Sequence, residues 1–317
     1  MSGAGAGLRV LVTCRQMQNC WSYFEQQFAD LGIAVDQPEI VQQPSEEELI
    51  EIIGQYDGMI AGDDPLTREV LGHAKKLKIL SKWGVGTDGI DKVAAAELGI
   101  PVTNTPNVFG DEVADVAMGY VTMLARQFHR IHNSVAEGGW WKWEGQSISG
   151  LDAGIIGFGS IGQATARRCL GFGMNVHAYD VTPEAEAAAQ ELGVAYEPLE
   201  TVFANADYLI LCAPLVPATK HIVNADTLAL MRKGSRLVNV SRGPLVDEPA
   251  LIAALESGHL AAAGLDVFEV EPLPADSPLR KFEQNVYGSH NGSNTAEGSL
   301  RASYKAVDNL LSGLGLQ

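Results

Sequence analysis

The sequence has few basic residues: 22 Lys and Arg stand against 39 Asp and Glu, which gives a net charge of -17 at pH 7. A surface of that charge repels polyanions, so we expect neither nucleic acid nor an anionic membrane as a partner. No apolar run approaches the length that spans a bilayer, and residues 1–7 lack the apolar stretch of a signal peptide. These absences predict a cytoplasmic protein.

Cysteine is also scarce, and no pair of cysteines has the CxxC spacing. This excludes a disulfide framework and is typical of buried thiols in a reducing compartment. His129 and His132 lie three residues apart, but no third ligand follows at the spacing of a metal site, so we predict no metal. The four cysteines are Cys14, Cys20, Cys169 and Cys212.

The composition is that of a folded chain, with 46% hydrophobic residues over 317 positions, enough for two ordinary cores. In the first third, short aliphatic runs alternate with helical stretches, which predicts a parallel α/β sheet. One helix opens after Ser45 with an acidic first turn, and another opens at Thr67 and ends near Gly72. The predicted strands are 9–13, 58–61, 78–81 and 101–103.

The stretch 113–126 is apolar on nearly every face of a helix, which indicates burial on all sides, between domains or subunits. A break follows at 138–143, where Trp140, Trp141 and Trp143 lie close together. Tryptophans so close to one another seldom face solvent, so we expect a subunit interface or a pocket wall here. A homodimer is the expected assembly.

A second alternating series begins at Ala153 and supplies enough strands for a complete doubly wound sheet. The final stretch, 295–314, is helical and has no strand of its own to complete, so it could pack on either domain. The predicted strands of this series are 153–157, 175–179, 208–212, 236–240, 262–267 and 285–288.

A GxGxxG motif lies at 157–162, between a predicted strand and a predicted helix, and this context makes the motif informative. Gly157 makes a tight turn, Gly159 lets the backbone approach a pyrophosphate, and Gly162 permits close packing of helix on strand. Amides near Ser160 and Ile161 at the helix N-terminus would hold the phosphates. Taken alone, the hexapeptide could also be a glycine turn that binds no dinucleotide.

The next strand ends at Asp180, where dinucleotide-binding folds place a carboxylate that accepts hydrogen bonds from ribose hydroxyls. A carboxylate there repels a 2′-phosphate, and residues 181–183 offer no Arg or Lys to bind one. NAD is therefore the expected cofactor, in preference to NADP. Cys212 and Pro214, which come at the end of a later strand and just after it, are also expected beside the cofactor.

Three further stretches carry groups that could orient a substrate and move a proton. Arg242 lies just past a strand, where α/β sheets bind their ligands. Glu271 precedes a proline in Asp266-Val267-Phe268-Glu269-Val270-Glu271-Pro272, and His290 lies in a turn-rich loop after the last strand. Singly, each could be structural: an ion-pair partner of Asp247, a surface acid and a capping residue.

Together these motifs resemble those of the D-isomer-specific 2-hydroxyacid dehydrogenases over essentially the whole chain, most closely the phosphoglycerate dehydrogenase-like branch. The resemblance implies a catalytic trio of Arg242, Glu271 and His290, with Glu269 as a competitor for the role of Glu271. The segment 84–91 is similar to the family's substrate-carboxylate loop, which makes the amides of Val85 and Gly86 substrate-binding. By the same resemblance Asp266 would contact the nicotinamide carboxamide.

The chemistry of 2-oxo acid reduction calls for these residue types. Hydride transfer to C2 needs a proton donor for the developing alkoxide and fixed positive charge for the carboxylate. The planar fork of Arg242 can bind the carboxylate, and His290 can donate the proton in reduction and accept it in oxidation. Glu271 within reach of the imidazole would favour its protonated form and orient it.

The predicted fold is a Rossmann doubly wound parallel sheet domain inserted in a flavodoxin-like α/β substrate-binding domain. We expect residues 104–289 to form the NAD-binding domain, and residues 1–103 with 290–317 to form the substrate-binding domain. Residues 104–106 resemble the crossing between the two domains in the family.

The motifs leave the substrate open among the small 2-hydroxy acids of the family. Glu271 argues against the formate branch, where a Gln stands, and Val85 argues against phosphite oxidation, where a lysine is expected. Asp63 and Asp64 would repel a phosphate, although Lys82 or Lys142 could bind a distal anion. Two rivals are a dinucleotide-sensing protein without turnover and an NAD enzyme with different chemistry.

Overall fold

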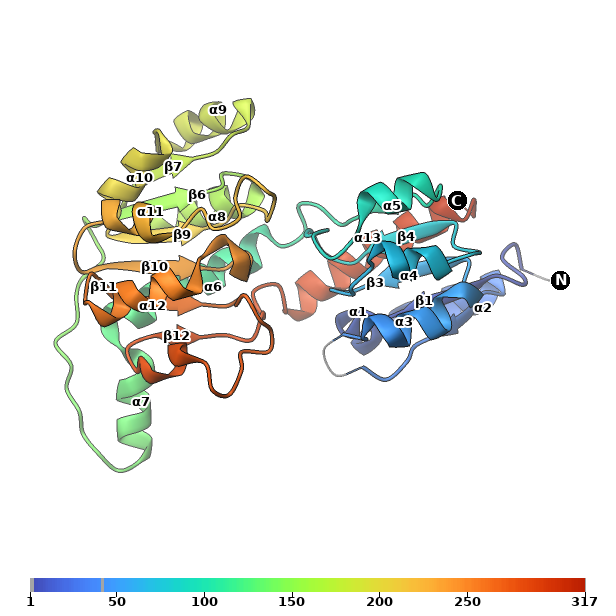
Figure 1. Cartoon of the computed structure of the whole chain (residues 1–317), viewed down its shortest axis with the longest axis horizontal. Helices are drawn as coiled ribbons and strands as arrows, with labels where there is room; N and C mark the ends of the chain where they lie inside the picture. The colour runs from blue at the N-terminus through green and yellow to red at the C-terminus, as the bar shows by residue number, and fades with distance from the viewer. Residues whose placement is uncertain (1–2, 41–42, 317) are drawn as a thin grey trace. The chain divides into compact units, whose positions relative to one another are not determined.

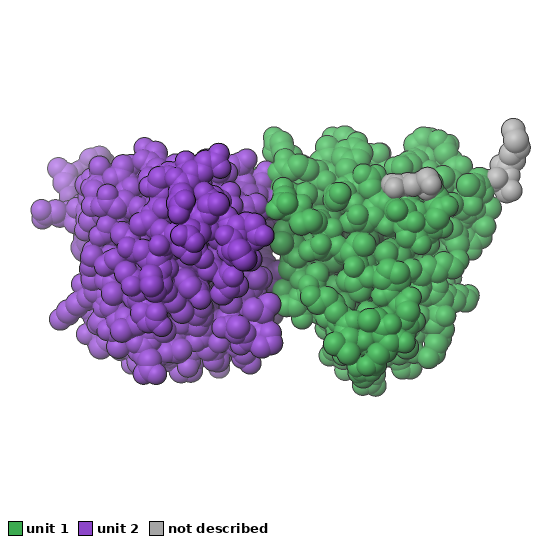
Figure 2. Space-filling view, turned by 90° about the horizontal axis from the view of Figure 1, so that it is seen from above, with its two compact units in different colours: residues 1–108, 294–317 green, residues 109–293 purple. Residues whose placement is uncertain are grey.

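The computed structural model describes residues 3–40 and 43–316, which form two compact units. Unit 1 is Met1–Val108 with Asn294–Gln317, and unit 2 is Phe109–Ser293 (Figure 2). Both boundaries lie a few residues beyond those expected from the sequence, so His290 is part of unit 2. Which unit binds which ligand stays a prediction. No helix among the described residues is long and apolar enough to cross a membrane.

Unit 1 contains a parallel sheet of strand order β2-β1-β3-β4-β5, the flavodoxin-like order, in its described residues (Figure 1). The strands are β1 (Arg9–Val12), β2 (Ala34–Asp36), β3 (Gly58–Ala61), β4 (Ile79–Lys82) and β5 (Val102–Thr103). The helices are α1 (Arg15–Asn19), η1 (Trp21–Tyr23), α2 (Glu25–Leu31), α3 (Glu46–Ile52), η2 (Ile53–Gln55), α4 (Arg68–His73), α5 (Lys92–Glu97) and α13 (Ala296–Gly313).

Local sequence signals begin two of these helices as expected. Ser45 accepts a hydrogen bond from the Glu48 amide, and the Glu48 side chain accepts one from the Ser45 amide, so α3 has a complete capping box. Thr67 caps α4 through the amide of Val70. The short edge strand β2 was not predicted.

The C-terminal helix α13 packs on the sheet of unit 1. The Ser81 hydroxyl on β4 donates to the carbonyl of Ala306 at 2.9 Å, and Trp83 Nε1 donates to the Ser303 hydroxyl at 2.9 Å. Both contacts are buried, so the last segment of the chain completes the core of the unit formed by the first segment.

Unit 2 contains a parallel sheet of order β12-β11-β10-β9-β6-β7-β8, which is the Rossmann order extended by one strand. The strands are β6 (Asp152–Ile156), β7 (Asn175–Tyr179), β8 (Ala195–Tyr196), β9 (Tyr208–Leu211), β10 (Ser235–Asn239), β11 (Leu260–Leu265) and β12 (Val286–Tyr287). The helices are α6 (Gly110–Arg126), α7 (Phe128–Ala136), α8 (Ser160–Gly171), α9 (Pro183–Leu192), α10 (Leu199–Asn205), α11 (Ala225–Leu230), η3 (Gly243–Leu245), α12 (Glu248–Glu256) and η4 (Pro278–Lys281).

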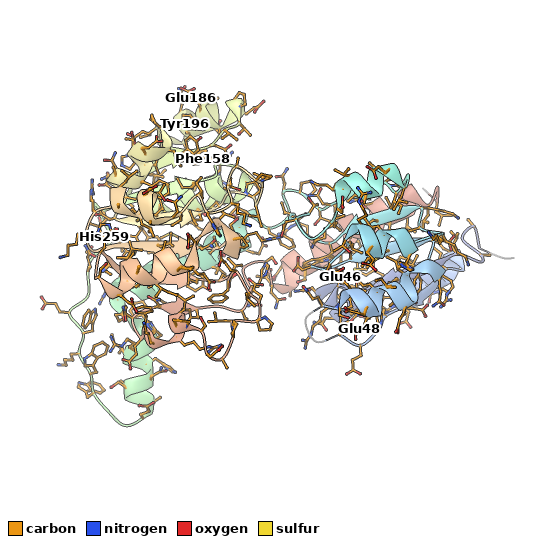
Figure 3. All side chains as sticks on the ribbon, in the orientation of Figure 1. Glu46, Glu48, Phe158, Glu186, Tyr196 and His259 are labelled. Atoms are coloured by element: carbon orange, nitrogen blue, oxygen red, sulfur yellow. The ribbon has the colours of Figure 1, made fainter. Side chains whose placement is uncertain are left out.

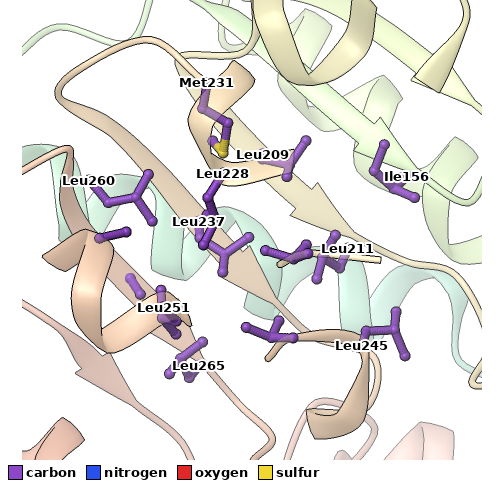
Figure 4. Close-up of a cluster of buried hydrophobic side chains, with 14 of the residues drawn as sticks. Ile156, Leu209, Leu211, Leu228, Met231, Leu237, Leu245, Leu251, Leu260 and Leu265 are labelled. Atoms are coloured by element: carbon purple, nitrogen blue, oxygen red, sulfur yellow. The ribbon is translucent and has the colours of Figure 1, made fainter. Parts of the chain in front are cut away.

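One core cluster of unit 2 lies between the sheet and the helices of one face. Aliphatic side chains of β9, β10 and β11 meet those of α11 and α12 there, as Figure 4 shows for Leu209, Leu237 and Leu251. The apolar helix α6 packs against α8 and the strands β10 and β11. Burial of α6 among these elements fixes the position of Tyr120.

Candidate active site

The glycine turn connects β6 to α8 and leaves one position open. Gly157 has φ +92°, and a Cβ on it would lie 2.4 Å from the amide nitrogen of Ala213; a Cβ on Gly162 would lie 2.1 Å from the carbonyl oxygen of Gly157. Both positions therefore require glycine. By contrast, Gly159 caps α8, is exposed and has nothing within 4 Å of a built Cβ. The turn thus offers the α8 N-terminus and open space to a ligand phosphate.

Asp180, at the end of β7, lies against the glycine turn. Its Oδ2 accepts a hydrogen bond from the Phe158 amide at 2.6 Å, and its Oδ1 accepts from the Thr182 amide at 2.9 Å. The Tyr196 hydroxyl on β8 donates to the Asp180 carbonyl, so Asp180 is held both by the turn that carries Phe158 and by β8 (Figure 3). The carboxylate is held where the sequence predicts a ribose contact.

Cys212 and Pro214 follow β9, the neighbour of β6 at the point where the strand order of the sheet reverses. The backbone of Cys212 and Ala213 packs against Gly157, and burial raises the pKa of the Cys212 thiol to about 12. Cys212 is therefore a neutral thiol at physiological pH. The carbonyl of Pro214 accepts a hydrogen bond from Thr219 at 2.6 Å, which orders the loop after β9.

The structure brings His290 and Glu271 together. His290 Nδ1 lies 2.8 Å from Glu271 Oε2, and each side chain is 24% exposed. The other oxygen, Oε1, accepts a hydrogen bond from the Phe268 amide at 2.9 Å, so both carboxylate oxygens have partners. The backbone of His290 has φ +53° and its amide donates to the carbonyl of Asp266. The imidazole is thus oriented from both its ring and its backbone.

Arg242 follows β10 and is half-buried at the carboxyl end of the sheet. Its carbonyl accepts from the Asn239 side chain at 2.9 Å, and its Nη1 donates to the Ser241 carbonyl at 2.9 Å. Asp247, the alternative ion-pair partner considered from the sequence, caps α12 through the amide of Ala250.

Tyr120 is a residue of this site that sequence reasoning missed. The buried phenol on α6 donates to Asp266 Oδ1 at 3.0 Å, and Asp266 Oδ2 accepts from the Gly292 amide at 2.8 Å. Burial raises the pKa of the Tyr120 phenol. Asp266 is 2% exposed, and its carbonyl and carboxylate both accept hydrogen bonds from the backbone of the His290 loop. Its predicted contact with the nicotinamide stays a prediction.

Glu269, the other candidate for the role of Glu271, contacts a different histidine. His221, in the loop after β9, places Nε2 2.6 Å from Glu269 Oε1. Sequence reasoning did not single out His221, which has no distinctive motif around it. The structure therefore pairs Glu271 with His290 and Glu269 with His221.

The predicted carboxylate loop of unit 1 is fixed by its neighbours in the chain segment 104–105. The side-chain nitrogen of Asn104 donates to the carbonyl of Val85 at 2.7 Å, and the backbone amide of Gly84 donates to the Thr105 hydroxyl at 2.9 Å. Gly84 has φ +116°, and Val85 is 41% exposed. Binding of substrate by Val85 and Gly86 stays a prediction.

Charged residues also gather at the carboxyl end of the unit 1 sheet. Asp64 is 1% exposed and accepts from the Thr13 hydroxyl at 2.8 Å; burial raises its pKa to about 6. Lys82 lies at the end of β4. Its Nζ is 3.2 Å from Asp63 Oδ1 and donates to the Trp83 carbonyl at 2.6 Å. Its ammonium is therefore engaged within the unit.

A Rossmann sheet with an open glycine turn, a helix N-terminus and a carboxylate beside it is typical of a dinucleotide-binding protein, and a His–Glu pair at the same sheet edge can act as a general acid and base. The geometry of Gly157, Gly159 and Asp180 fits NAD.

A family model described as D-isomer specific 2-hydroxyacid dehydrogenase, NAD binding domain, matches residues 118–292. A hydroxypyruvate reductase from Thermotoga maritima is 39% identical over 277 residues, covering 85% of this chain and 89% of the relative. A glyoxylate reductase from Korarchaeum cryptofilum is 38% identical over 310 residues, covering 96% and 92%. A crystal structure of D-lactate dehydrogenase from Aquifex aeolicus, complexed with NAD and lactic acid, has a TM-score of 0.84 at 25% identity, covering 97% and 96%.

The chain belongs to the D-isomer specific 2-hydroxyacid dehydrogenase family. It is an NAD-dependent oxidoreductase that acts on hydroxy and oxo acids.

Proposed function

We propose that this enzyme reduces small unphosphorylated 2-oxo acids, glyoxylate and hydroxypyruvate foremost, with His290 as the acid/base. The observation that carries the proposal is the contact of 2.8 Å between His290 Nδ1 and Glu271 Oε2 at the carboxyl edge of the Rossmann sheet. The names of the relatives, hydroxypyruvate reductase and glyoxylate reductase, support the substrate class.

When bound as NADH, the cofactor supplies a hydride to C2 of the oxo acid. His290 donates its Nε2 proton to the substrate oxygen, which becomes the hydroxyl, and is left as neutral imidazole. Glu271 stabilises the protonated imidazole before the transfer and keeps Nδ1 turned away from the substrate. Arg242 binds the carboxylate and polarises the carbonyl through its guanidinium. In oxidation the same groups act in reverse.

The charges of unit 1 support an unphosphorylated substrate. Asp63 and Asp64 follow β3, and the ammonium of Lys82 is already bound by Asp63 and by the Trp83 carbonyl. A phosphate brought near these carboxylates would be repelled. The sequence predicts the phosphoglycerate dehydrogenase-like branch, and the following substrate screen tests that prediction.

The test is a screen of NADH oxidation with glyoxylate, hydroxypyruvate, pyruvate, phosphohydroxypyruvate and a bulkier 2-oxo acid. His290→Asn is the control, because asparagine tolerates the positive φ of this position. We expect glyoxylate or hydroxypyruvate to have the highest kcat/KM. A preference for phosphohydroxypyruvate would contradict the substrate, and no turnover of any 2-oxo acid would contradict the activity.

We also propose a homodimer formed through α7 and the tryptophan segment that follows it. No residue of α7 is buried, and large apolar side chains are exposed along this stretch: Phe128 46%, Val135 46%, Trp140 78% and Trp143 47%. An apolar surface of this kind typically marks a protein interface. Light scattering should give the mass of two chains for wild type. The double variant Trp140→Ser, Trp143→Ser should give a mass closer to that of one chain. A monomeric wild type would contradict the dimer.

The expected cytoplasmic location is part of the proposal as well. All four cysteines are free thiols, which supports a reducing compartment. Immunoblotting of cell fractions tests this expectation, and recovery from a secreted or membrane fraction would contradict it.

A further inference from the structure

A second histidine–carboxylate pair lies beside the one used in the proposed reaction. Glu269 and Glu271 belong to the same loop after β11, but Glu269 points to His221 and Glu271 to His290. The distance from His221 Nε2 to Glu269 Oε1 is 2.6 Å, and the two side chains are 39% and 27% exposed. The proposed reaction does not use this pair.

The backbone of His221 is fixed to the loop that carries Arg242. The His221 amide donates to the carbonyl of Pro244 at 2.8 Å, and Val223 forms a parallel bridge with Val246. His221 has φ +51°, a conformation that histidine seldom adopts without such constraints. His221 therefore connects the loop after β9, which is bonded to the Arg242 loop, with the loop after β11.

The loop after β11 reaches Glu271 through a short run of constrained backbone. The Glu269 amide donates to Glu248 Oε1 at 2.8 Å, and the Phe268 amide donates to Glu271 Oε1 at 2.9 Å. A Cβ built on Gly243 would lie 1.9 Å from the carbonyl carbon of Phe268, so the two loops touch backbone to backbone. The backbone of Phe268 and Glu269 is thus held in place. With it is held the Phe268 amide, which donates to the Glu271 carboxylate.

From these contacts we propose that His221 and Glu269 form a positioning bridge, which holds the Phe268 amide against Glu271 and so sets the geometry between Glu271 and His290. The inference rests on the proposed function, because it assigns the bridge to that reaction. His221 and Glu269 act through Glu271 and do not touch the substrate.

The charges around the bridge explain why a histidine serves there. Glu248, at the start of α12, faces Glu269, and burial together with the charge of Glu269 raises the pKa of Glu248. Lys220 precedes His221 in the chain, and Arg242 and Glu271 lie on the two bridged loops. A hydrogen bond from His221 offsets the repulsion between the two glutamates.

The test compares His221→Asn with a matched control, His177→Asn. Asparagine keeps the left-handed backbone of position 221 but is too short to reach Glu269. His177 on β7 also contacts carboxylates, with Nδ1 2.9 Å from Glu197 and Nε2 3.4 Å from Asp152, and lies away from the loops of the proposed site. Melting temperature and NADH affinity are measured for both variants.

We expect His221→Asn to lower kcat roughly tenfold, as a small misplacement of a catalytic group does, with the KM for NADH unchanged. Its kcat/KM for reduction should fall at a lower pH than in wild type, in the same direction as for Glu271→Gln. In the Glu271→Gln background, His221→Asn should cause no further change of the pH profile. His177→Asn should leave the profile unchanged. A wild-type profile and kcat in His221→Asn would overturn the inference.

Two further measurements apply if His221→Asn fails to fold or if no substrate is found. Glu269→Gln keeps an acceptor for His221 and should retain more activity than Glu269→Ala; equal activities would overturn the bridge. Proton NMR should show a downfield signal of the His290 Nδ1 proton, assigned with His290→Asn, that is broadened or lost in Glu269→Ala. Wild type without turnover contradicts the proposed function alone, whereas a signal that persists in Glu269→Ala overturns the bridge.

Discussion

The two units use the same winding but differ at the edge where such sheets bind ligands. In unit 1 the switch point lies between β1 and β3, and there Thr13 and Asp64 are buried and hydrogen-bonded to each other at 2.8 Å. In unit 2 it lies between β6 and β9, and there Gly159 and Ser160 are exposed at the start of α8. The switch point of unit 1 is filled by its own side chains, and that of unit 2 is open.

The difference teaches that topology places a possible site but side chains decide whether it is one. Both sheets direct their carboxyl ends and the following loops to one edge. Unit 2 has glycines there and a helix of twelve residues behind them. Unit 1 has a short helix, α1, and a buried carboxylate.

The largest expected effect comes from the catalytic histidine of unit 2. His290→Asn should lower kcat by about 10²- to 10⁴-fold, because the proton donor is lost while the backbone conformation is tolerated. NADH affinity, followed by fluorescence, and the melting temperature should change little. A variant that retains most of its kcat would remove His290 from the mechanism.

Two glycine variants in the turn of unit 2 distinguish a residue needed for packing from a residue that leaves room for the ligand. Gly157→Ala forces a Cβ against Ala213 at positive φ and should cost more than about 3 kcal/mol of unfolding free energy. Gly159→Ala meets no protein atom, so its stability should stay within about 0.5 kcal/mol of wild type. Its Kd for NADH should nevertheless rise roughly tenfold, because the methyl group would occupy the space expected for the pyrophosphate. Equal effects of the two variants on stability would contradict this separation.

Asp180 should decide between the two nicotinamide cofactors. Asp180→Ser removes the charge that repels a 2′-phosphate, so the preference for NADH over NADPH should fall roughly tenfold or more. The measurement is kcat/KM for each cofactor at fixed oxo acid. Equal use of NADH and NADPH by wild type would contradict the role given to Asp180.

The smallest effect on activity is expected at the filled switch point of unit 1. The folded pKa of Asp64 is about 6 and its ordinary value is 3.8, so the folded state favours the protonated form. The resulting stability is present below pH 3.8 and is lost as the pH rises through 6, up to about 3 kcal/mol. Asp64→Asn should therefore raise the melting temperature at pH 8 and change it little at pH 4. Exposed Asp30→Asn is the control, and a pH-independent effect of Asp64→Asn would contradict the linkage.

Much of the fold was predictable because its signals are local. Strands 58–61 and 175–179 were predicted at the bounds the structure has, and the alternation of strands and helices gave the parallel sheets. The edge strands β2 and β8, of three and two residues, were missed, whereas β5 and β12, which are as short, were predicted as parts of longer stretches. Their pairing depends on a neighbouring strand already in place.

The site was only partly predictable, for a related reason. Arg242, Glu271 and His290 were singled out because each follows a strand in a distinctive motif. Tyr120 was interpreted as one apolar residue among many on its helix, because its partner Asp266 lies 146 positions along the chain. Nothing near Tyr120 indicates a hydrogen bond to a buried carboxylate.

By itself, the sequence determined the glycine turn, the carboxylate after the next strand and the residue types of the three loops. Only the tertiary structure decided which glutamate meets which histidine. Glu269 and Glu271 are two residues apart and chemically alike, yet one contacts His221 and the other His290. Such contacts act over about 3 Å, and the backbone path of each loop, fixed by packing against its neighbours, sets which atoms come that close.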